Sequence, residues 1–446
     1  MDSGYISIII LAIAIIFYVT ELLPIPIVAM SSAALMVIFG VIPAETAWGA
    51  FSQNSVLIMA GVILMGSTLF TTGAAGVLGE VLIKIAGGKP KLSILLMLTA
   101  AGVMSFVMNN TMCTVLFLPL ILSVVVRAKD ESIYEQKYMQ ILVIMTSTGG
   151  LMTLVGSGVN VASSGMLEAS GYDPFTFTQF SKVALPLFIM VLVYTFTIGD
   201  KYADKIFGKN RKHSDFVNEF IMQQQKEDLE AVEINVIDAG AQKEATRRKT
   251  TSAVIMLAAI LGFLTEKYHG VSLGTIAVTG GLLTVITKCI TFKEMVQKIS
   301  WSTLLFLGGT IGCAAGLAQS GGGQIIADFF INLFGKSVTP IIVFIVMSLI
   351  AGVITQFMSN TGSCGIMIPI GVSLAAGIGM NPLPVAIGIV LCASCSFVTP
   401  MASPTTALVI DWGSYNFKDY IKYSGPITLL LNIMILVLVP LYFPLK

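Results

Sequence analysis

Long uncharged stretches alternate with short charged segments along this chain of 446 residues. Uncharged runs at 92–126, 138–167 and 337–410 each exceed the ~20 apolar residues that a helix needs to span a bilayer. The pattern therefore predicts an all-α polytopic membrane protein. Ordinary spans are expected at about 5–22, 24–42, 54–73, 137–170, 180–199, 251–265, 271–287, 301–318, 381–412 and 424–443.

Two further apolar segments, about 91–126 and 338–376, are too long for one span and are interrupted midway by polar residues. If the N-terminus is outside and both segments are re-entrant hairpins, most basic residues fall in cytoplasmic loops, as the positive-inside rule requires. We therefore predict about 10–11 transmembrane helices plus two re-entrant helical hairpins in the cell (plasma) membrane. All but four of the 25 basic residues are then cytoplasmic, the exceptions being Lys182, Lys267, Lys336 and Lys446.

Composition supports this class, because only 11% of the residues are charged and the mean hydropathy is +0.89. A soluble domain would carry roughly a quarter charged residues. The net charge of +1, without a basic tract, gives no indication of nucleic-acid binding. Cys392 and Cys395 form a C-x-x-C inside an apolar stretch, where we expect packing of small residues and not a redox or metal site.

One charged segment, 200–249, holds 20 of the 49 acidic and basic residues. We interpret it as a cytoplasmic, interfacial connector between two halves. Ser214 could cap an amphipathic helix. Its apolar face would carry Phe216, Val217, Phe220 and Ile221.

The two halves repeat each other in sequence. Residues 106–111 read FVMNNT and residues 356–361 read QFMSNT, 250 positions later, and each is followed at the same spacing by a proline. Broken spans follow both segments, at 155–160 and 400–406. The predicted topology gives the halves, 1–199 and 250–446, opposite orientations. Inverted repeats with broken helices are typical of secondary transporters whose site lies between the repeats.

The hairpin turns and broken spans supply the candidate chemistry. Helix starts at such breaks present free N–H groups and a positive dipole end, which suit the carboxylates of an anion. Asn and Thr side chains add donors for carboxylates and oxygens for Na⁺. The predicted substrate-binding residues are Asn109, Asn110, Thr111, Ser157, Ser359, Asn360, Thr361, Ser403 and Pro404.

Other functional classes fit less well. Neither hairpin interior carries an ionisable side chain, and both histidines, His213 and His269, fall in predicted loops. A proton relay therefore has little to work with, and Glu21 is expected at a membrane interface. The chain has no H-E-x-x-H and no P-loop, so we expect no enzyme. A channel is less favoured, because internal symmetry with broken helices indicates alternating access.

Gly308, Gly312 and Gly316 repeat at intervals of four residues. This small-xxx-small pattern predicts close packing against a neighbouring helix.

The paired turns resemble the Ser-Asn-Thr signature of the divalent anion/sodium symporter (DASS) family, the INDY-type dicarboxylate carriers. The signature stands here as 109–111 and 359–361, and Glu21-Leu22-Leu23-Pro24 entering a span adds to the resemblance, which covers essentially the whole chain. It implies an elevator mechanism and a homodimer, with a scaffold of roughly 1–75 and 250–320. It also implies two Na⁺ sites, at Ser105, Asn110 and Gly156 and at Thr355, Asn360 and Ala402.

Three departures from the family pattern bear on coupling. Asn109 replaces the usual serine, and neither broken span reads Thr-Pro-Pro-Asn. The third is an expectation, that the extra N-terminal span usual in the family has no counterpart in this sequence. The first two changes touch the Na⁺ sites and favour exchange (antiport). In the other direction, a divalent anion in a site without a fixed cation invites Na⁺ as charge compensation.

The function expected from the sequence is therefore transport of C4 and C5 dicarboxylates such as succinate, malate, fumarate and 2-oxoglutarate. No cofactor is required, and Na⁺ is the candidate coupling ion. The alternative is Na⁺-coupled symport. More remote alternatives are an organic-anion channel and a carrier of citrate or sulfate.

Overall fold

The computed structural model describes residues 2–446 except 21, 75–80, 83, 129, 131, 209–238, 335–338, 401 and 414. All regular elements in this part of the chain are helices, and none is a strand, which confirms the all-α class. Six helices in the described part are long and apolar enough to cross a membrane, and five shorter apolar helices accompany them. The expectations for Glu21 and for the amphipathic helix after Ser214 lie outside the described residues.

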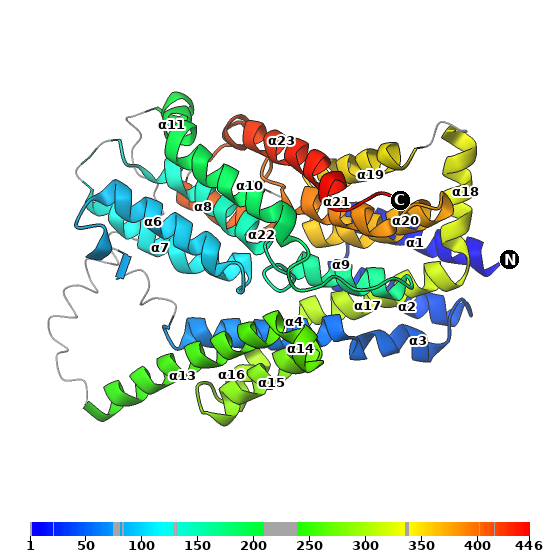
Figure 1. Ribbon diagram of the computed structural model, residues 1–446, viewed down its shortest axis with the longest axis horizontal. Coiled ribbons are helices and arrows are strands. Elements are labelled where there is room, and N and C mark those ends of the chain that lie inside the picture. The colour runs from blue at the N-terminus through cyan, green and yellow to red at the C-terminus, as the bar shows by residue number, and fades with distance from the viewer. Residues whose placement is uncertain are drawn as a thin grey trace.

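Figure 1 shows the helices as two interleaved halves. The first half comprises α1 (Ser3–Thr20), α2 (Ile25–Ile38), α3 (Ala44–Gly49), η1 (Ala50–Ser52), α4 (Asn54–Thr71), α6 (Pro90–Met104), α7 (Asn110–Arg127), α8 (Glu135–Gly150), α9 (Gly158–Ala169), α10 (Ser181–Tyr194), η2 (Thr195–Gly199) and α11 (Asp200–Phe207). The second comprises α13 (Ala239–Leu264), α14 (Glu266–His269), α15 (Leu273–Ile286), α16 (Phe292–Lys298), α17 (Trp301–Gln319), α18 (Gly322–Phe334), α19 (Pro340–Ile354), α20 (Asn360–Gly377), α21 (Pro382–Ser394), α22 (Pro404–Gly413) and α23 (Phe417–Tyr442).

Both polar interruptions are tight turns between antiparallel helices. The turns lie at 105–109, between α6 and α7, and at 355–359, between α19 and α20. Both long uncharged spans break where small and polar residues cluster, between α8 and α9 and between α21 and α22. The boundaries next to the charged connector differ from the sequence expectation. The chain stays helical past 199 through η2 into α11, and α13 begins at 239, because charged residues lengthen these helices beyond their apolar parts.

The halves exchange partners at their closest helix contacts. α4 of the first half packs on α15 of the second, and α17 of the second packs on α2 of the first. A Cβ atom on Gly61 would lie 2.2 Å from the backbone of Ala277, and one on Gly309 would lie 2.5 Å from the backbone of Ala29. Gly309 follows Gly61 by 248 residues, and Ala277 follows Ala29 by the same number. An approximate two-fold relation between the halves produces such reciprocal contacts.

The glycine repeat on α17 packs as the sequence predicted. A Cβ atom on Gly308 would lie 2.4 Å from the Phe51 ring, and one on Gly312 would lie 2.9 Å from the carbonyl oxygen of Ala47. These glycines let α17 approach α3 and η1 closely, which confirms the packing interpretation.

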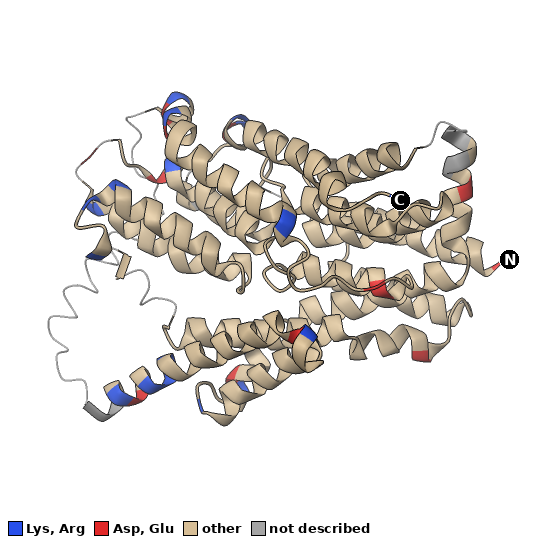
Figure 2. Cartoon of the chain, viewed as in Figure 1, with Lys and Arg blue, Asp and Glu red and all other residues tan. Residues whose placement is uncertain are grey.

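Basic residues gather at one end of the molecule. Figure 2 shows Lys and Arg around α11, the start of α6 and the start of α13, whereas the end with α3 and α18 carries acidic residues. Lys137 of α8 is buried there, with its Nζ 2.6 Å from Asp200 Oδ1 and 3.1 Å from Asp204 Oδ1. Lys91 of α6 also pairs with Asp200. These ion pairs fasten α11 to the first hairpin and to α8.

Candidate functional site

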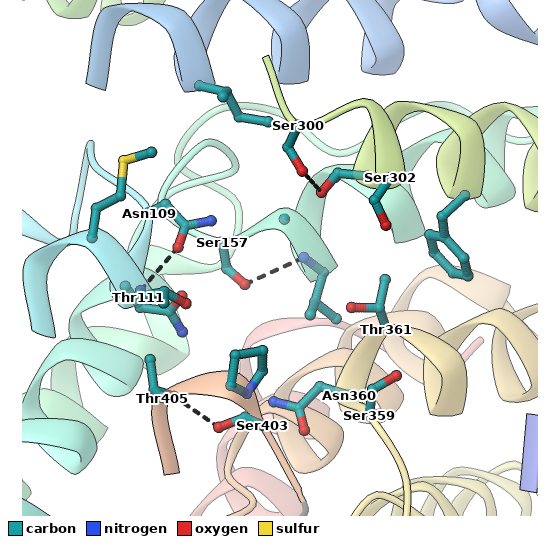
Figure 3. A pocket seen from close by; sticks show the side chains of 18 of the residues that line it. Asn109, Thr111, Ser157, Ser300, Ser302, Ser359, Asn360, Thr361, Ser403 and Thr405 are labelled. Carbon is teal, nitrogen blue, oxygen red and sulfur yellow. Dashed lines mark hydrogen bonds between the residues drawn. The ribbon is translucent and has the colours of Figure 1, made fainter. Parts of the chain in front are cut away.

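Both hairpin turns and both helix breaks meet at one cavity of about 500 Å³. All nine predicted substrate-binding residues line it, and Figure 3 labels ten of its lining residues, which come from both halves. The sequence therefore identified the residues that the fold brings together. The remaining lining residues are Ile25, Pro26, Ile63, Met112, Ser147, Gly158, Val159, Lys298, Ser300, Ser302, Thr303, Phe306, Ser394 and Thr405.

In the first half, two helices begin at the cavity with polar caps. Asn109 caps α7 by accepting a hydrogen bond from the Thr111 amide at 2.9 Å. Asn110 directs its own side-chain oxygen to the same amide at 3.0 Å. Ser157 caps α9 through the Val159 amide at 3.3 Å. Side chains of this kind hold helix starts in place by satisfying free N–H groups.

The second half repeats the arrangement with different side chains. Ser359 caps α20 by accepting from the Gly362 amide at 3.1 Å. Ser403 accepts from the Thr406 amide at 3.2 Å at the start of α22. Four helix N-termini, those of α7, α9, α20 and α22, thus border one cavity. Their dipoles and free amides favour an anion there.

Behind the second turn, polar atoms surround the Asn360 amide. The amide oxygen lies 2.6 Å from Ser396 Oγ and 2.8 Å from Thr355 Oγ1. The same position is 2.8 Å from the carbonyl oxygen of Ala402 and 3.2 Å from that of Ala393. We call these five residues the second-turn oxygen group. With its NH₂ turned inward, Asn360 would donate into the group, and with its oxygen inward the five oxygens would suit a small cation.

Behind the first turn, the buried oxygens are less complete. Ser105 Oγ and Asn160 Oδ1 are buried and have no hydrogen-bond partner among the described residues. A Cβ atom on Gly156 would lie 2.6 Å from the carbonyl oxygens of Gly150 and Ser105, so glycine is needed for this close approach. We call Ser105, Gly150, Gly156 and Asn160 the first-turn oxygen group.

The predicted Na⁺ residues fall on these two groups with one exception. Ser105 and Gly156 lie together behind the first turn, and Thr355, Asn360 and Ala402 lie together behind the second. Asn110 lines the cavity instead, with its side-chain oxygen on the Thr111 amide. Oxygen donors without carboxylates suit a monovalent hard cation, so the residues present fit Na⁺. Asn160 and Ser396 complete the groups and were not predicted.

The wall opposite the turns was missed by sequence reasoning. It comes from the end of α16 and the start of α17 and includes Lys298, Ser300, Ser302 and Thr303. The hydroxyl groups of Ser300 and Thr303 are 2.7 Å apart. Lys298 is the one charged residue among those that line the cavity. No fixed cation was expected at the site from the sequence, and the fold corrects this by bringing the last residue of α16 to the cavity.

Comparison with known proteins places these features in a family. The sequence profile described as "citrate transporter" (CitMHS) matches residues 15–335 and 314–445 of this chain. The chain belongs to the citrate transporter family. Citrate transporter family members and their relatives are transporters and not enzymes, so this chain is an integral membrane transport protein.

Relatives of this citrate transporter family chain span nearly its whole length. An uncharacterized transporter of Haemophilus influenzae is 25% identical over 453 residues, covering 96% of this chain and 89% of the relative. The sodium-dependent dicarboxylate transporter SdcS of Staphylococcus aureus is 22% identical over 454 residues, covering 96% and 84%. These alignments link the family both to transport and to the DASS resemblance seen in the sequence.

Two solved structures share the fold. The YdaH transporter of Alcanivorax borkumensis superposes with a TM-score of 0.57 at 13% identity, covering 89% of this chain and 87% of YdaH. MtrF of Neisseria gonorrhoeae gives a TM-score of 0.57 at 14% identity, covering 100% and 96%. At this identity the likeness shows the fold alone, and the fold is that of membrane transporters.

Proposed function

We propose that this protein carries C4 and C5 dicarboxylates across the cell membrane by alternating access. The observation that supports this is the pair of Asn-Thr turns, 110–111 and 360–361, that line one cavity from opposite halves. Each turn offers an amide, a hydroxyl and a helix N-terminus, which together can bind one carboxylate. Two such half-sites match an anion with a carboxylate at each end.

We propose that Na⁺ accompanies the anion. The sequence alone favours exchange, but the oxygen groups behind both turns favour sodium coupling, and so does the similarity to a transporter named for sodium dependence. Ser105, Gly156 and Asn160 would hold one ion, and Thr355, Asn360, Ser396 and Ala402 the other. Bound Na⁺ would offset the charge of a divalent anion that must leave water. Exchange remains the alternative.

The proposed mechanism is an elevator. The scaffold, roughly 1–75 and 250–320, would stay fixed in a homodimer, and the hairpins with the broken helices would move. Contacts between the two parts run along α4 and α17, which pack on α9 and touch α7 and α20. The basic end of the molecule, including the charged connector, would face the cytoplasm.

Uptake of labelled succinate into liposomes that contain the purified protein tests the proposal. Internal succinate and external Na⁺ are varied independently. Uptake that follows Na⁺ into empty liposomes is the expected result. Uptake that needs internal dicarboxylate and ignores Na⁺ would establish exchange. Absence of uptake under both conditions would refute succinate as substrate, and citrate and sulfate would then be measured in the same way.

A further inference from the structure

Lys298 lines two neighbouring cavities. It lines the central cavity, and it also lines a second cavity of about 250 Å³ that reaches the ends of α4 and α7. Thr111 and Met112 of the first turn line both cavities as well. Lys298 therefore stands where the central cavity passes into a vestibule.

Hydrogen bonds from Thr291 lower the pKa of Glu294, and the ammonium charge of Lys298 on the same helix lowers it further, but Lys298 forms no direct ion pair with this carboxylate. Glu294, four residues earlier on α16, is the natural partner for an i, i+4 ion pair. Its carboxylate is instead engaged at the helix start, where it accepts hydrogen bonds from the Thr291 amide at 2.7 Å and the Thr291 hydroxyl at 2.8 Å. Within the part of the chain that the structure describes, no carboxylate forms an ion pair with Lys298.

Hydroxyl groups line the same wall of the central cavity as this cation. Ser302 and Thr303 follow on the first turn of α17 and line the central cavity with Lys298. Thr111 faces the vestibule from α7. A fixed positive charge with neighbouring hydroxyl donors is a suitable place for a carboxylate.

We propose that Lys298, together with Ser302 and Thr303, forms a staging position that binds one carboxylate of the substrate at the mouth of the cavity. This inference rests on the proposed function. The staging position lies on the scaffold, whereas the turns belong to the moving part. It therefore serves the anion as it enters or leaves on one membrane face, which the basic residues identify as the cytoplasmic face.

A lysine at the end of a cytoplasmic helix also has an ordinary interpretation. It would follow the positive-inside rule and stabilise the helix C-terminus. Lys293 separates the two explanations, because it lies on the same helix, is exposed and lines neither cavity. Lys293→Gln and Lys298→Gln each remove one positive charge from the same helix.

The experiment measures succinate transport in inside-out and right-side-out vesicles from the same cells. Lys298→Gln should raise the KM for succinate about tenfold on the cytoplasmic face, a difference of ~1.4 kcal/mol, with kcat changed less than twofold. The KM on the outer face should change less than twofold. Lys298→Arg should restore the cytoplasmic KM to within threefold, and Lys293→Gln should match the wild type on both faces. Equal behaviour of the two Gln variants, or an equal rise of KM on both faces, would overturn the proposal.

A second measurement does not depend on transport. The purified protein is treated with an amine-acylating reagent, and modification of Lys298 and Lys293 is compared by mass spectrometry with and without succinate, citrate or sulfate. Protection of Lys298 alone by any of the three supports the staging position. Equal modification in every case overturns it, even where the wild-type protein carries succinate. Protection without uptake would instead refute the proposed function and retain the anion position.

Discussion

The two hairpin turns follow a similar backbone path, but the side chains of Asn110 and Asn360 have different hydrogen-bond partners. Asn360 faces inward to the second-turn oxygen group, whereas Asn110 bonds the start of its own helix. Both turns keep a capped helix start toward the cavity, through Asn109 and Ser359. Both halves therefore present a capped helix start to the cavity. The polar groups behind the turns have diverged.

At the first turn, glycines allow a close approach of the backbone, whereas the second turn has larger residues at its break. Gly150 and Gly156 bring their carbonyl groups close to Ser105, while the corresponding break in the second half accommodates Ala402. Two buried oxygens, on Ser105 and Asn160, are left without partners among the described residues. We therefore expect the first turn to tolerate added volume poorly and the second turn to tolerate loss of its amide poorly.

The largest effects should come from Asn110→Ala and Asn360→Ala. A hydrogen bond to a charged group is worth ~1.5–3 kcal/mol, about 10- to 100-fold in rate, which should bring succinate uptake close to background in both variants. Folded yield by size-exclusion chromatography should stay at the wild-type level. A lower Tm in Asn360→Ala alone would support a structural role for the Asn360 amide that Asn110 does not share. Wild-type uptake in either variant would remove that turn from the mechanism.

Gly156→Ala should reduce uptake about tenfold or more. The new Cβ atom would fall 2.6 Å from two backbone oxygens, which cannot move aside as a side chain can. Gly425→Ala on α23 is the control, because its Cβ atom would meet no described atom within 4 Å and Gly425 does not line the central cavity, so uptake should stay within threefold of the wild type. Equal uptake in the two variants would show that the close approach at the first turn is dispensable.

A smaller effect is expected on the Na⁺ dependence of uptake, and together with the Tm it should distinguish the two oxygen groups. Ser105→Ala and Thr355→Ala should each raise the Na⁺ concentration for half-maximal uptake roughly fivefold, which corresponds to ~1 kcal/mol for one ligand. Ser105→Ala should change the Tm little, because its oxygen meets the full hydrogen-bond criteria with no described residue, whereas Thr355→Ala loses a bond to the Ala393 carbonyl at 2.9 Å. An unchanged Na⁺ requirement in both variants would favour exchange.

The smallest effect is expected from Asn109→Ser, which makes the first turn read like the second. Asparagine and serine cap helices about equally well, so uptake should change less than threefold. A rise in Na⁺ affinity in this variant would show that Asn109 weakens the first oxygen group. A loss of more than tenfold would mean that Asn109 contacts the substrate in a way that serine cannot replace.

Much of the fold could be predicted because it is repeated. The Asn-Thr pairs stand 250 residues apart, and each is placed at a helix start that a polar cap defines. The length of the two uncharged segments and the positions of Lys and Arg predicted that these segments form re-entrant hairpins and not single spans. The helices α3 and α16 were not predicted, because segments of six or seven residues leave no strong periodic signal. Helix α18 was also not predicted, although its 13 residues are largely apolar.

The missed part of the site has no repeat to reveal it. At the offset of 248 residues that relates Gly61 to Gly309, the first half has Ala50 where the second has Lys298. Ser396 and Asn160 were not predicted as site residues for a different reason. Their oxygens reach the oxygen groups only because of the path of the backbone at each helix break. Local sequence does not specify that path, since it depends on contacts with the neighbouring hairpin.

The exchange of partners between α4 and α15 and between α17 and α2 also governs how the protein can assemble. While the first half emerges from the ribosome, the face of α2 that packs on α17 and the face of α4 that packs on α15 are uncovered, because these partners lie more than 200 residues further along the chain. We therefore expect that neither half reaches its final packing alone, because these contacts need α15 and α17. The membrane insertion machinery must therefore hold an unfinished bundle, and two separately synthesised halves should function only when they are produced in the same cell.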